Sequence, residues 1–306
     1  MPVPKLALLF PGQGSQSVGM GKILVGASAA ARAVFEEADA VLGFPLSRLC
    51  FEGPEEELKR TVNTQPAILT LSVAALRDLE SRSPGRLAGT AFAAGHSLGE
   101  YSADVAAGVL EFPDALRLVR QRGRFMQEAV PAGVGAMAAV IGLAAEEVEL
   151  ACRETAGDEV VGPANFNTPE QTVIAGHSAA VKRASEACRA RGAKRVLPLP
   201  VSAPFHCALM GPARERMRPL LEAAEFRDPA IPVVTNVDAQ ACTRGALLRD
   251  ALIRQIDSPV RWVESVRRLY AEGVDRALEV GPGNVLAGLV RRIEAGLPVE
   301  SSGGGG

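Results

Sequence analysis

The chain has 306 residues, enough for one large domain or two ordinary ones, and 47% of them are hydrophobic, which excludes disorder over most of its length. The formal net charge of −2 excludes a global basic field, and the aromatic fraction of 4%, with one tryptophan, argues against base-stacking platforms. We therefore expect no nucleic-acid partner.

The first third of the chain alternates between strand and helix patterns. Leu6–Phe10 and Thr90–Ala94 read as strands, and a Pro-Gly-Gln-Gly turn follows the first of them. Helical periodicity predicts helices at Ala29–Leu42, Pro54–Lys59, Pro66–Leu79, from Gly99 through about Ala107, and Asp114–Glu128, where Asp114 is the expected cap.

The segment from Gly135 to Val201 has the order strand-helix-strand-strand-helix-strand, which is the ferredoxin-like pattern. Its expected elements are Ala136–Ile141, Ala145–Thr155, Val160–Asn165, Thr172–Ala175, Ala179–Arg191 and Arg195–Leu199. We therefore expect a small α+β subdomain at residues 131–201, inserted into a larger subdomain formed by residues 1–130 and 202–300.

The remaining third returns to the alternation of the first. The expected elements are a strand at Val233–Asn236, helices at Ala246–Ile256 and Pro259–Ala271, a strand at Arg276–Val280 and one last helix. Residues 301–306, Ser-Ser-Gly-Gly-Gly-Gly, are expected to form a flexible tail.

The five cysteines are scattered and form no C-x-x-C pair, and the chain has only three histidines. That spacing supports neither a zinc site nor a disulfide framework, so we expect a reducing compartment, no metal and no cofactor. The N-terminus shows no long apolar segment of a signal peptide, and the longest uncharged stretch, Ala129–Ala145, is too short to span a bilayer. We expect a cytoplasmic protein without membrane contact, and nothing demands more than a monomer.

Gly95-His96-Ser97-Leu98-Gly99 has the pattern G-x-S-x-G between a predicted strand and a predicted helix, which is the context that a nucleophile elbow requires. Glycines flank the serine because the sharp turn brings backbone atoms close together. The helix start supplies amide N–H groups for an oxyanion. The sequence thus predicts Ser97 as a nucleophile in a hydrolase-like α/β subdomain with a central parallel sheet.

A serine nucleophile needs a base, and the three histidines are the candidates. His96 adjoins the serine, where opposite side-chain directions disfavour a productive contact, and His177 reads as a surface residue of the inserted subdomain. His206 lies in a proline-punctuated loop, of the kind that often holds catalytic groups. Elimination favours His206, and a structural loop histidine is the alternative.

Arg122 falls in the middle of the apolar face of the helix predicted at Asp114–Glu128. An unpaired buried guanidinium is too costly, so it must meet a carboxylate or equivalent acceptors. Two readings remain open: a structural ion pair, or a clamp for a substrate carboxylate.

Gln13, in the turn after the first strand, is a candidate second oxyanion donor through its backbone N–H. The nucleotide-binding alternatives fail on spacing. Gly21-Lys22 is followed by Ile23 rather than Ser or Thr, and Ser17 stands where the third glycine of a Rossmann fingerprint belongs.

The chain as a whole resembles the malonyl-CoA:acyl carrier protein transacylases and the related acyltransferase domains of polyketide synthases. The resemblance runs nearly end to end. It is carried, in order, by FPGQGSQ (Phe10–Gln16), TQPA (Thr64–Ala67), GHSLGEYSA (Gly95–Ala103), RGRFMQEA (Arg122–Ala129), NFNTP (Asn165–Pro169), APFHCALM (Ala203–Met210) and EVGPG (Glu279–Gly283).

The resemblance implies a role for each matching residue. Ser97 would carry the acyl group, His206 would be its base, and Arg122 would pair with the malonyl carboxylate. The amides of Gln13 and Leu98 would form the oxyanion hole. The backbone carbonyl of Gln255 would orient the histidine, and Asn165 and Asn167 match positions that line the cleft between the subdomains.

The implied activity is transfer of a malonyl group from malonyl-CoA to the phosphopantetheine thiol of acyl carrier protein, with ping-pong kinetics, in fatty-acid synthesis. A polyketide-pathway acyltransferase, a serine thioesterase or hydrolase, and a non-catalytic binding subunit remain as alternatives. An acidic carrier protein fits a basic cluster, although an ordinary solvated helix end is the other reading of it: Lys182, Arg183, Arg189, Arg191, Lys194 and Arg195.

Overall fold

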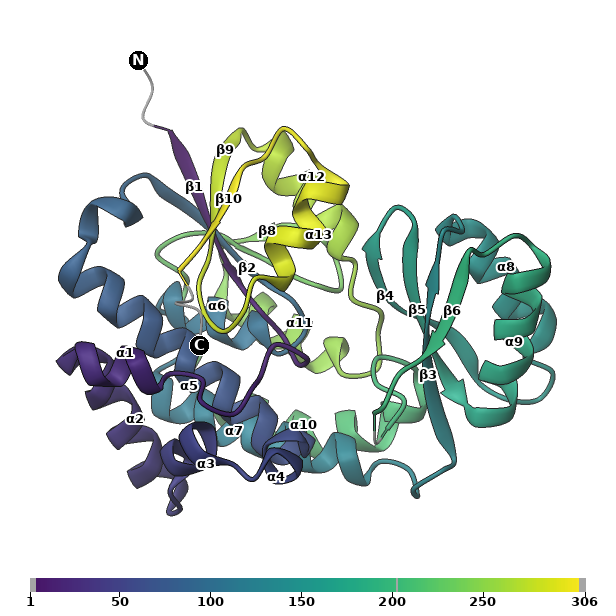
Figure 1. The fold of residues 1–306 in the computed structure, drawn as a ribbon, viewed down its shortest axis with the longest axis horizontal. Helices are drawn as coiled ribbons and strands as arrows, with labels where there is room; N and C mark the ends of the chain where they lie inside the picture. The colour runs from purple at the N-terminus through teal and green to yellow at the C-terminus, as the bar shows by residue number, and fades with distance from the viewer. Residues whose placement is uncertain (1–3, 202, 303–306) are drawn as a thin grey trace.

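The structure, a computed structural model, describes residues 4–201 and 203–302. Its strands form two separate sheets, one of six strands and one of four. Figure 1 shows the smaller sheet and its helices as a distinct lobe at the right of the view. The α/β fold expected from the sequence, with a central parallel sheet and a smaller α+β part, is confirmed.

The larger sheet has the order β10-β9-β1-β2-β7-β8, and all its neighbours are parallel except β7 and β8. Its strands are β1 (Lys5–Phe10), β2 (Thr90–Gly95), β7 (Val233–Val234), β8 (Ala241–Cys242), β9 (Val274–Glu279) and β10 (Val299–Ser301). β1 and β2 lie in the middle, buried on both faces, which explains why they read as short continuous apolar runs.

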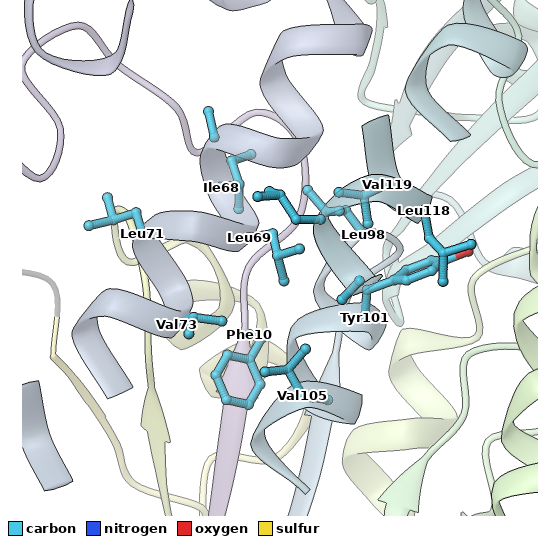
Figure 2. Close-up of a cluster of buried hydrophobic side chains, with 14 of the residues drawn as sticks. Phe10, Ile68, Leu69, Leu71, Val73, Leu98, Tyr101, Val105, Leu118 and Val119 are labelled. Carbon is cyan, nitrogen blue, oxygen red and sulfur yellow. The ribbon is translucent and has the colours of Figure 1, made fainter. Parts of the chain in front are cut away.

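Alternate residues of β1 face two different apolar clusters. Leu6, Leu8 and Phe10 pack in the larger cluster with α2 (Ala29–Leu42), α5 (Thr61–Arg82), α6 (Gly99–Ala106) and α7 (Phe112–Glu128). Ala7 and Leu9 pack on the opposite face with α12 (Trp262–Ala271) and α13 (Val285–Ile293). Figure 2 shows Phe10 of the larger cluster together with Val73 of α5 and Val105 of α6. The site therefore stands on a sheet covered by helices on both faces.

Further short helices complete the larger lobe. They are α1 (Lys22–Ala27), α3 (Leu46–Glu52), α4 (Glu55–Lys59), α10 (Gly211–Ala223) and α11 (Gly245–Gln255), with 3₁₀ turns η1 (Pro84–Leu87) and η2 (Ala208–Met210). None of the helices in the described residues is both long enough and apolar enough to cross a membrane.

The smaller sheet is antiparallel, with the order β4-β5-β3-β6. Its elements follow the chain as β3 (Gly135–Ile141), α8 (Ala145–Thr155), β4 (Val161–Thr168), β5 (Gln171–His177), α9 (Ser178–Ala190) and β6 (Arg195–Pro198). The two helices share one apolar cluster with the strands. The ferredoxin-like element order predicted from the sequence is thus observed.

A short parallel bridge connects β4 of the small sheet with the large lobe. The Val260 N–H donates to the Ala164 carbonyl at 2.9 Å, and the Phe166 N–H donates to the Val260 carbonyl at 2.9 Å. β4 of the small sheet is therefore fixed to the segment between α11 and α12 of the large lobe.

Several predicted element bounds need correction. α5 begins at Thr61 and holds Pro66 inside it, and α7 begins at Phe112 with Glu111 rather than Asp114 as its N-cap. α10 was not predicted at all. Ser301, expected in the flexible tail, pairs with Glu279 as the last residue of β10, and residues 303–306 of that tail lie outside the described residues.

Candidate active site

Ser97 sits on the tight connection between β2 and α6. Its φ of 53° lies in the left-handed region, where the backbone of a residue other than glycine is strained. A Cβ on Gly95 would come within 1.9 Å of the Gly99 carbonyl carbon, and a Cβ on Gly99 within 2.0 Å of the Phe10 carbonyl oxygen. Both flanking glycines are therefore required by the close approach of backbone that the turn imposes.

His206 reaches Ser97 from the loop between β6 and α10. Its Nε2 lies 2.7 Å from the Ser97 Oγ, and its Nδ1 lies 2.9 Å from the Gln255 carbonyl oxygen. A carbonyl only accepts, so Nδ1 carries the proton and Nε2 is left to accept the serine hydroxyl. The arrangement is a dyad oriented by a main-chain carbonyl.

The surroundings of His206 keep its imidazole neutral. Burial and the nearby Arg122 charge lower the pKa of His206 from 6.5 to about 3, although the hydrogen bond to the Gln255 carbonyl acts in the opposite direction. A neutral imidazole at every physiological pH is the form that can take a proton from Ser97.

Arg122 of α7 is 1% exposed and points at the nucleophile. Its guanidinium donates to the Gln65 Oε1 at 2.9 Å, to the Gln255 Oε1 at 2.7 Å and to the Ser97 Oγ at 3.2 Å. Among residues 4–201 and 203–302 no carboxylate lies within 4.0 Å of it. The structural ion pair considered from the sequence therefore lacks its partner there, and three neutral oxygens hold the charge instead.

Of the two predicted oxyanion donors, Leu98 lies in the elbow itself and Gln13 lies in the loop that packs against it. Leu98 is the N-cap of α6, a position whose amide takes no part in the helix ladder. The loop with Gln13 passes close to the elbow, because a Cβ on Gly12 would lie 2.4 Å from the His96 carbonyl oxygen. The Gln13 side chain is directed elsewhere, donating to the Thr61 Oγ1 at 3.3 Å.

Three further residues, to which no sequence motif assigns a role, complete the site. Gln65 of α5 holds Arg122. The Asn236 side chain accepts from the Ser97 N–H at 2.6 Å, and the Glu100 Oε2 accepts from the Asn236 N–H at 2.9 Å. Glu100 is the one of the three with a local signal, because it and Asp104 are acidic residues in a predicted helix of mostly small side chains.

Two acidic side chains of α6 are completely buried. Burial raises the pKa of Glu100 to about 7, although hydrogen bonds from Gln255 and Asn236 and the charge of Arg122 oppose the shift. Burial also raises the pKa of Asp104 well above its ordinary value, with a further contribution from Glu100. The neighbourhood of Ser97 therefore carries less negative charge than its composition suggests.

The comparison with known families agrees with this geometry, because the model of the acyl transferase domain matches residues 7–298. The chain belongs to the acyltransferase family. Among curated proteins, it is 53% identical over 289 residues to the malonyl CoA-acyl carrier protein transacylase of Escherichia coli (strain K12), covering 94% of this chain and 93% of that protein. The malonyl CoA-acyl carrier protein transacylase of Bacillus subtilis (strain 168) is 49% identical over 296 residues, covering 96% of this chain and 92% of that protein.

Solved acyltransferase structures give the same result. An acyl carrier protein S-malonyltransferase from Vibrio cholerae matches with a TM-score of 0.94 and 51% identity, covering 97% of this chain and 96% of that one. A malonyl-transacylase in complex with a type II polyketide synthase acyl carrier protein matches with a TM-score of 0.94 and 49% identity, covering 97% and 95%.

In this acyltransferase the other two histidines stay away from the Ser97 hydroxyl. The His96 Nε2 lies 2.9 Å from the Asn167 Oδ1 of β4 in the small lobe, and the ring lies 5.6 Å from that of Trp262. His177 ends β5, where its Nδ1 accepts from the Val160 N–H at 2.9 Å. Asn165 is buried beside the bridge to Val260.

Much of the basic cluster on the small lobe of the acyltransferase is already paired. Arg191 donates to Glu147 and Glu154, Arg183 lies 2.9 Å from Glu159, and the Lys194 ammonium lies 3.8 Å from the Glu170 carboxylate. The positive charge available to an acidic partner is therefore smaller than the sequence suggested.

The residues that the structure describes contain no group of three or more His, Cys, Asp or Glu side chains placed to hold a metal ion. Four of the five cysteines are buried and Cys242 is half-buried, and none of the five is in a disulfide. Burial raises the pKa of the Cys207 thiol, next to His206, to about 11, so this thiol stays protonated and does not compete with Ser97 as a nucleophile.

Proposed function

We propose that this acyltransferase moves the malonyl group of malonyl-CoA to the phosphopantetheine thiol of acyl carrier protein, through a malonyl ester on Ser97. Its relatives are named for this reaction and cover nearly the whole chain. The observation that carries the proposal is the buried Arg122 guanidinium, 3.2 Å from the Ser97 Oγ and held only by neutral oxygens. A substrate carboxylate supplies the counter-charge that this guanidinium lacks.

In the first half-reaction His206 takes the Ser97 proton on Nε2 while the Ser97 Oγ attacks the thioester carbonyl carbon. The amides of Gln13 and Leu98 hold the oxyanion of the tetrahedral intermediate. The intermediate collapses with cleavage of the carbon–sulfur bond, and the thiolate of CoA leaves with the proton from His206. Malonyl-Ser97 and free CoA remain.

In the second half-reaction the thiol of the carrier protein gives its proton to His206 and attacks malonyl-Ser97. Cleavage of the ester returns the proton to the Ser97 Oγ and leaves the malonyl thioester on the carrier. The same base, acid and oxyanion donors serve both directions, so no third catalytic group is needed.

Arg122 has a second consequence for the base. Its charge is one reason why the pKa of His206 lies low. A malonyl carboxylate bound to Arg122 offsets that charge, so the pKa of His206 rises when malonyl is present. His206 is therefore a stronger base toward Ser97 when a malonyl substrate is bound than when an acetyl substrate is bound.

The decisive experiment incubates the protein with labelled malonyl-CoA, with and without holo acyl carrier protein. We expect label on the carrier, and label on the enzyme alone when the carrier is left out. A Ser97→Ala control should show neither. Release of free malonate at a rate that equals or exceeds loading of the carrier would establish a hydrolase and contradict the proposal.

The carrier is expected to be that of fatty-acid synthesis. A polyketide carrier is the second candidate, since one structural match is a complex with a type II polyketide synthase acyl carrier protein. Comparing kcat/KM for the two kinds of holo carrier, at one fixed malonyl-CoA concentration, separates them. A higher value for the polyketide carrier would assign the enzyme to that pathway.

A further inference from the structure

Asn236 lies two residues beyond β7 and is completely buried behind the nucleophile. Its Oδ1 accepts from the Ser97 N–H at 2.6 Å, and its Nδ2 donates to the Gly95 carbonyl at 2.6 Å. One side-chain amide thus bonds to the backbone on both sides of His96. No substrate atom needs to touch it, because its two polar ends are both occupied by the turn.

The turn needs such support. Ser97 is a non-glycine residue with φ of 53°, and a residue in that region keeps its conformation only where its surroundings hold it. The orientation of the Ser97 Oγ toward His206 depends on that φ. The Asn236 side chain bonds to the backbone of Gly95 and of Ser97 itself, and so holds the strained residue without contacting its hydroxyl.

Asn236 is in turn held by Glu100. The Glu100 Oε2 accepts from the Asn236 N–H at 2.9 Å and from the Gln255 Nε2 at 2.8 Å. The Gln255 carbonyl oxygen accepts from His206. A single carboxylate oxygen therefore connects the residue that holds the nucleophile with the residue that holds the base.

We propose that Asn236 is a positioning residue for Ser97 in acyl transfer, and that Glu100 holds Asn236 in register with Gln255. This inference rests on the proposed role of Ser97 as the acyl-carrying nucleophile. It also leaves oxyanion binding to Leu98 and Gln13, because the Ser97 amide hydrogen is already donated to Asn236.

The first test is Asn236→Ala in the full-length chain. We expect kcat/KM for malonyl-CoA to fall by about 10²-fold, since a small displacement of a nucleophile has an effect of that order. Labelling of Ser97 by a fluorophosphonate should slow by a similar factor. In the Ser97→Ala background the added change should leave the Kd for malonyl-CoA within about twofold, because Asn236 acts through Ser97 alone.

The second test is Asn236→Asp, which keeps the shape of the side chain. A protonated carboxyl can donate to the Gly95 carbonyl and accept from the Ser97 N–H, whereas a carboxylate can only accept. We expect the activity of N236D relative to wild type to be higher at pH 6 than at pH 8. Glu100, with a pKa raised to about 7, lies next to the introduced carboxyl, so the same ratio is also measured in the Glu100→Gln background, where the pH dependence of N236D should persist.

Ser185→Ala is the matched control, because it removes a buried side-chain hydrogen bond, to the Val181 carbonyl at 2.7 Å, in the other lobe. It should leave labelling and transfer unchanged. The proposal is overturned if folded N236A labels and transfers within about threefold of wild type. It is equally overturned if malonyl-CoA binding weakens as much as transfer, or if the N236D ratio is independent of pH.

The two proposals can fail separately. Fluorophosphonate labelling reports the reactivity of Ser97 without any malonyl group. If N236A slows labelling but the wild-type enzyme loads no carrier protein, the positioning role stands and the proposed function is wrong. If N236A does not fold, the pH dependence of N236D decides the matter.

Discussion

The two lobes of the molecule differ in whether they bury charged side chains. In the described residues, every buried Asp, Glu and Arg belongs to the large lobe: Asp78, Glu100, Asp104, Arg122 and Glu279. In the small lobe the core beneath α8 and α9 is apolar, and the charges form exposed pairs such as Arg191 with Glu147.

Burial of an ionisable group opposes folding unless the group is paired, so the large lobe carries these residues at a cost in stability. Two of these residues, Glu100 and Arg122, belong to the hydrogen-bonded network around Ser97. The small lobe has an apolar core, whereas the large lobe gives up stability to bury Glu100 and Arg122 beside its reactive centre.

The largest expected effect comes from removing the reactive pair itself. Ser97→Ala and His206→Ala should each lower malonyl transfer by about 10⁴-fold or more, and the double variant should be no worse than either one. Transfer assays with holo carrier protein measure this. Because both side chains belong to a strained and costly region, the variants should unfold at the same temperature or higher, and a large loss of stability would break the comparison.

Arg122→Ala should change selectivity more than total acyl transfer. The ratio of kcat/KM for malonyl-CoA to that for acetyl-CoA should fall by about 10²-fold or more, because acetyl leaves the wild-type guanidinium unpaired and malonyl does not. Arg117→Ala, on the exposed face of the same helix, is the control. An unchanged ratio in R122A would reduce Arg122 to a structural residue.

The pH dependence follows from the lowered pKa of His206. Only the neutral imidazole accepts the Ser97 proton, and burial with the nearby Arg122 charge lowers the pKa of His206 to about 3. The acid limb of kcat/KM should therefore lie well below pH 6.5, the ordinary value for histidine. Buffers from pH 4 to pH 9 at constant ionic strength would measure it.

The titration of Glu100 must be distinguished from that of His206 in this measurement, because burial raises the pKa of Glu100 to about 7. Any inflection near pH 7 that disappears in Glu100→Gln belongs to that carboxyl. An acid limb that stays near 6.5 in both proteins would contradict the assignment of His206 as a buried, neutral base.

The smallest effect is expected in the small lobe. Arg191→Ala removes a partly exposed arginine from two glutamates and should leave the free energy of unfolding nearly unchanged, because surface ion pairs contribute little to stability. Its kcat/KM for malonyl-CoA should equal that of wild type. Chemical denaturation and the transfer assay measure both quantities, and a strong loss of activity would show that the small lobe does more than frame the cleft.

The sequence predicted the elements whose signals are local. The bounds of α2 and α8 are as predicted, because their apolar periodicity is uninterrupted. α5 was predicted to start at Pro66, where proline normally begins a helix, although the helix starts a turn and a half earlier. α10 contains Pro212 and Pro219 and closely spaced arginines, which obscured its period.

The site was predictable only as far as single residues carry their own signal. Ser97 has a local motif, and Arg122 is a charge on an apolar face. Asn236 and Gln65 have no such signal, since their partners lie 139 and 57 residues away in the chain. Long-range contacts of this kind depend on how the sheet and helices assemble, which composition and periodicity do not encode.

The orientation of His206 by the Gln255 main chain has a consequence for mutagenesis and for engineering. Every amino acid has a main-chain carbonyl. A point mutation at position 255 therefore keeps the acceptor of His206 unless it distorts the end of α11. The same residue's amide group, in contrast, holds Arg122, Glu100 and the Ser97 carbonyl. A mutational scan of Gln255 therefore keeps the acceptor of His206 but removes the contacts that hold Arg122, Glu100 and the Ser97 carbonyl, so it tests this side-chain network separately from the orientation of the base.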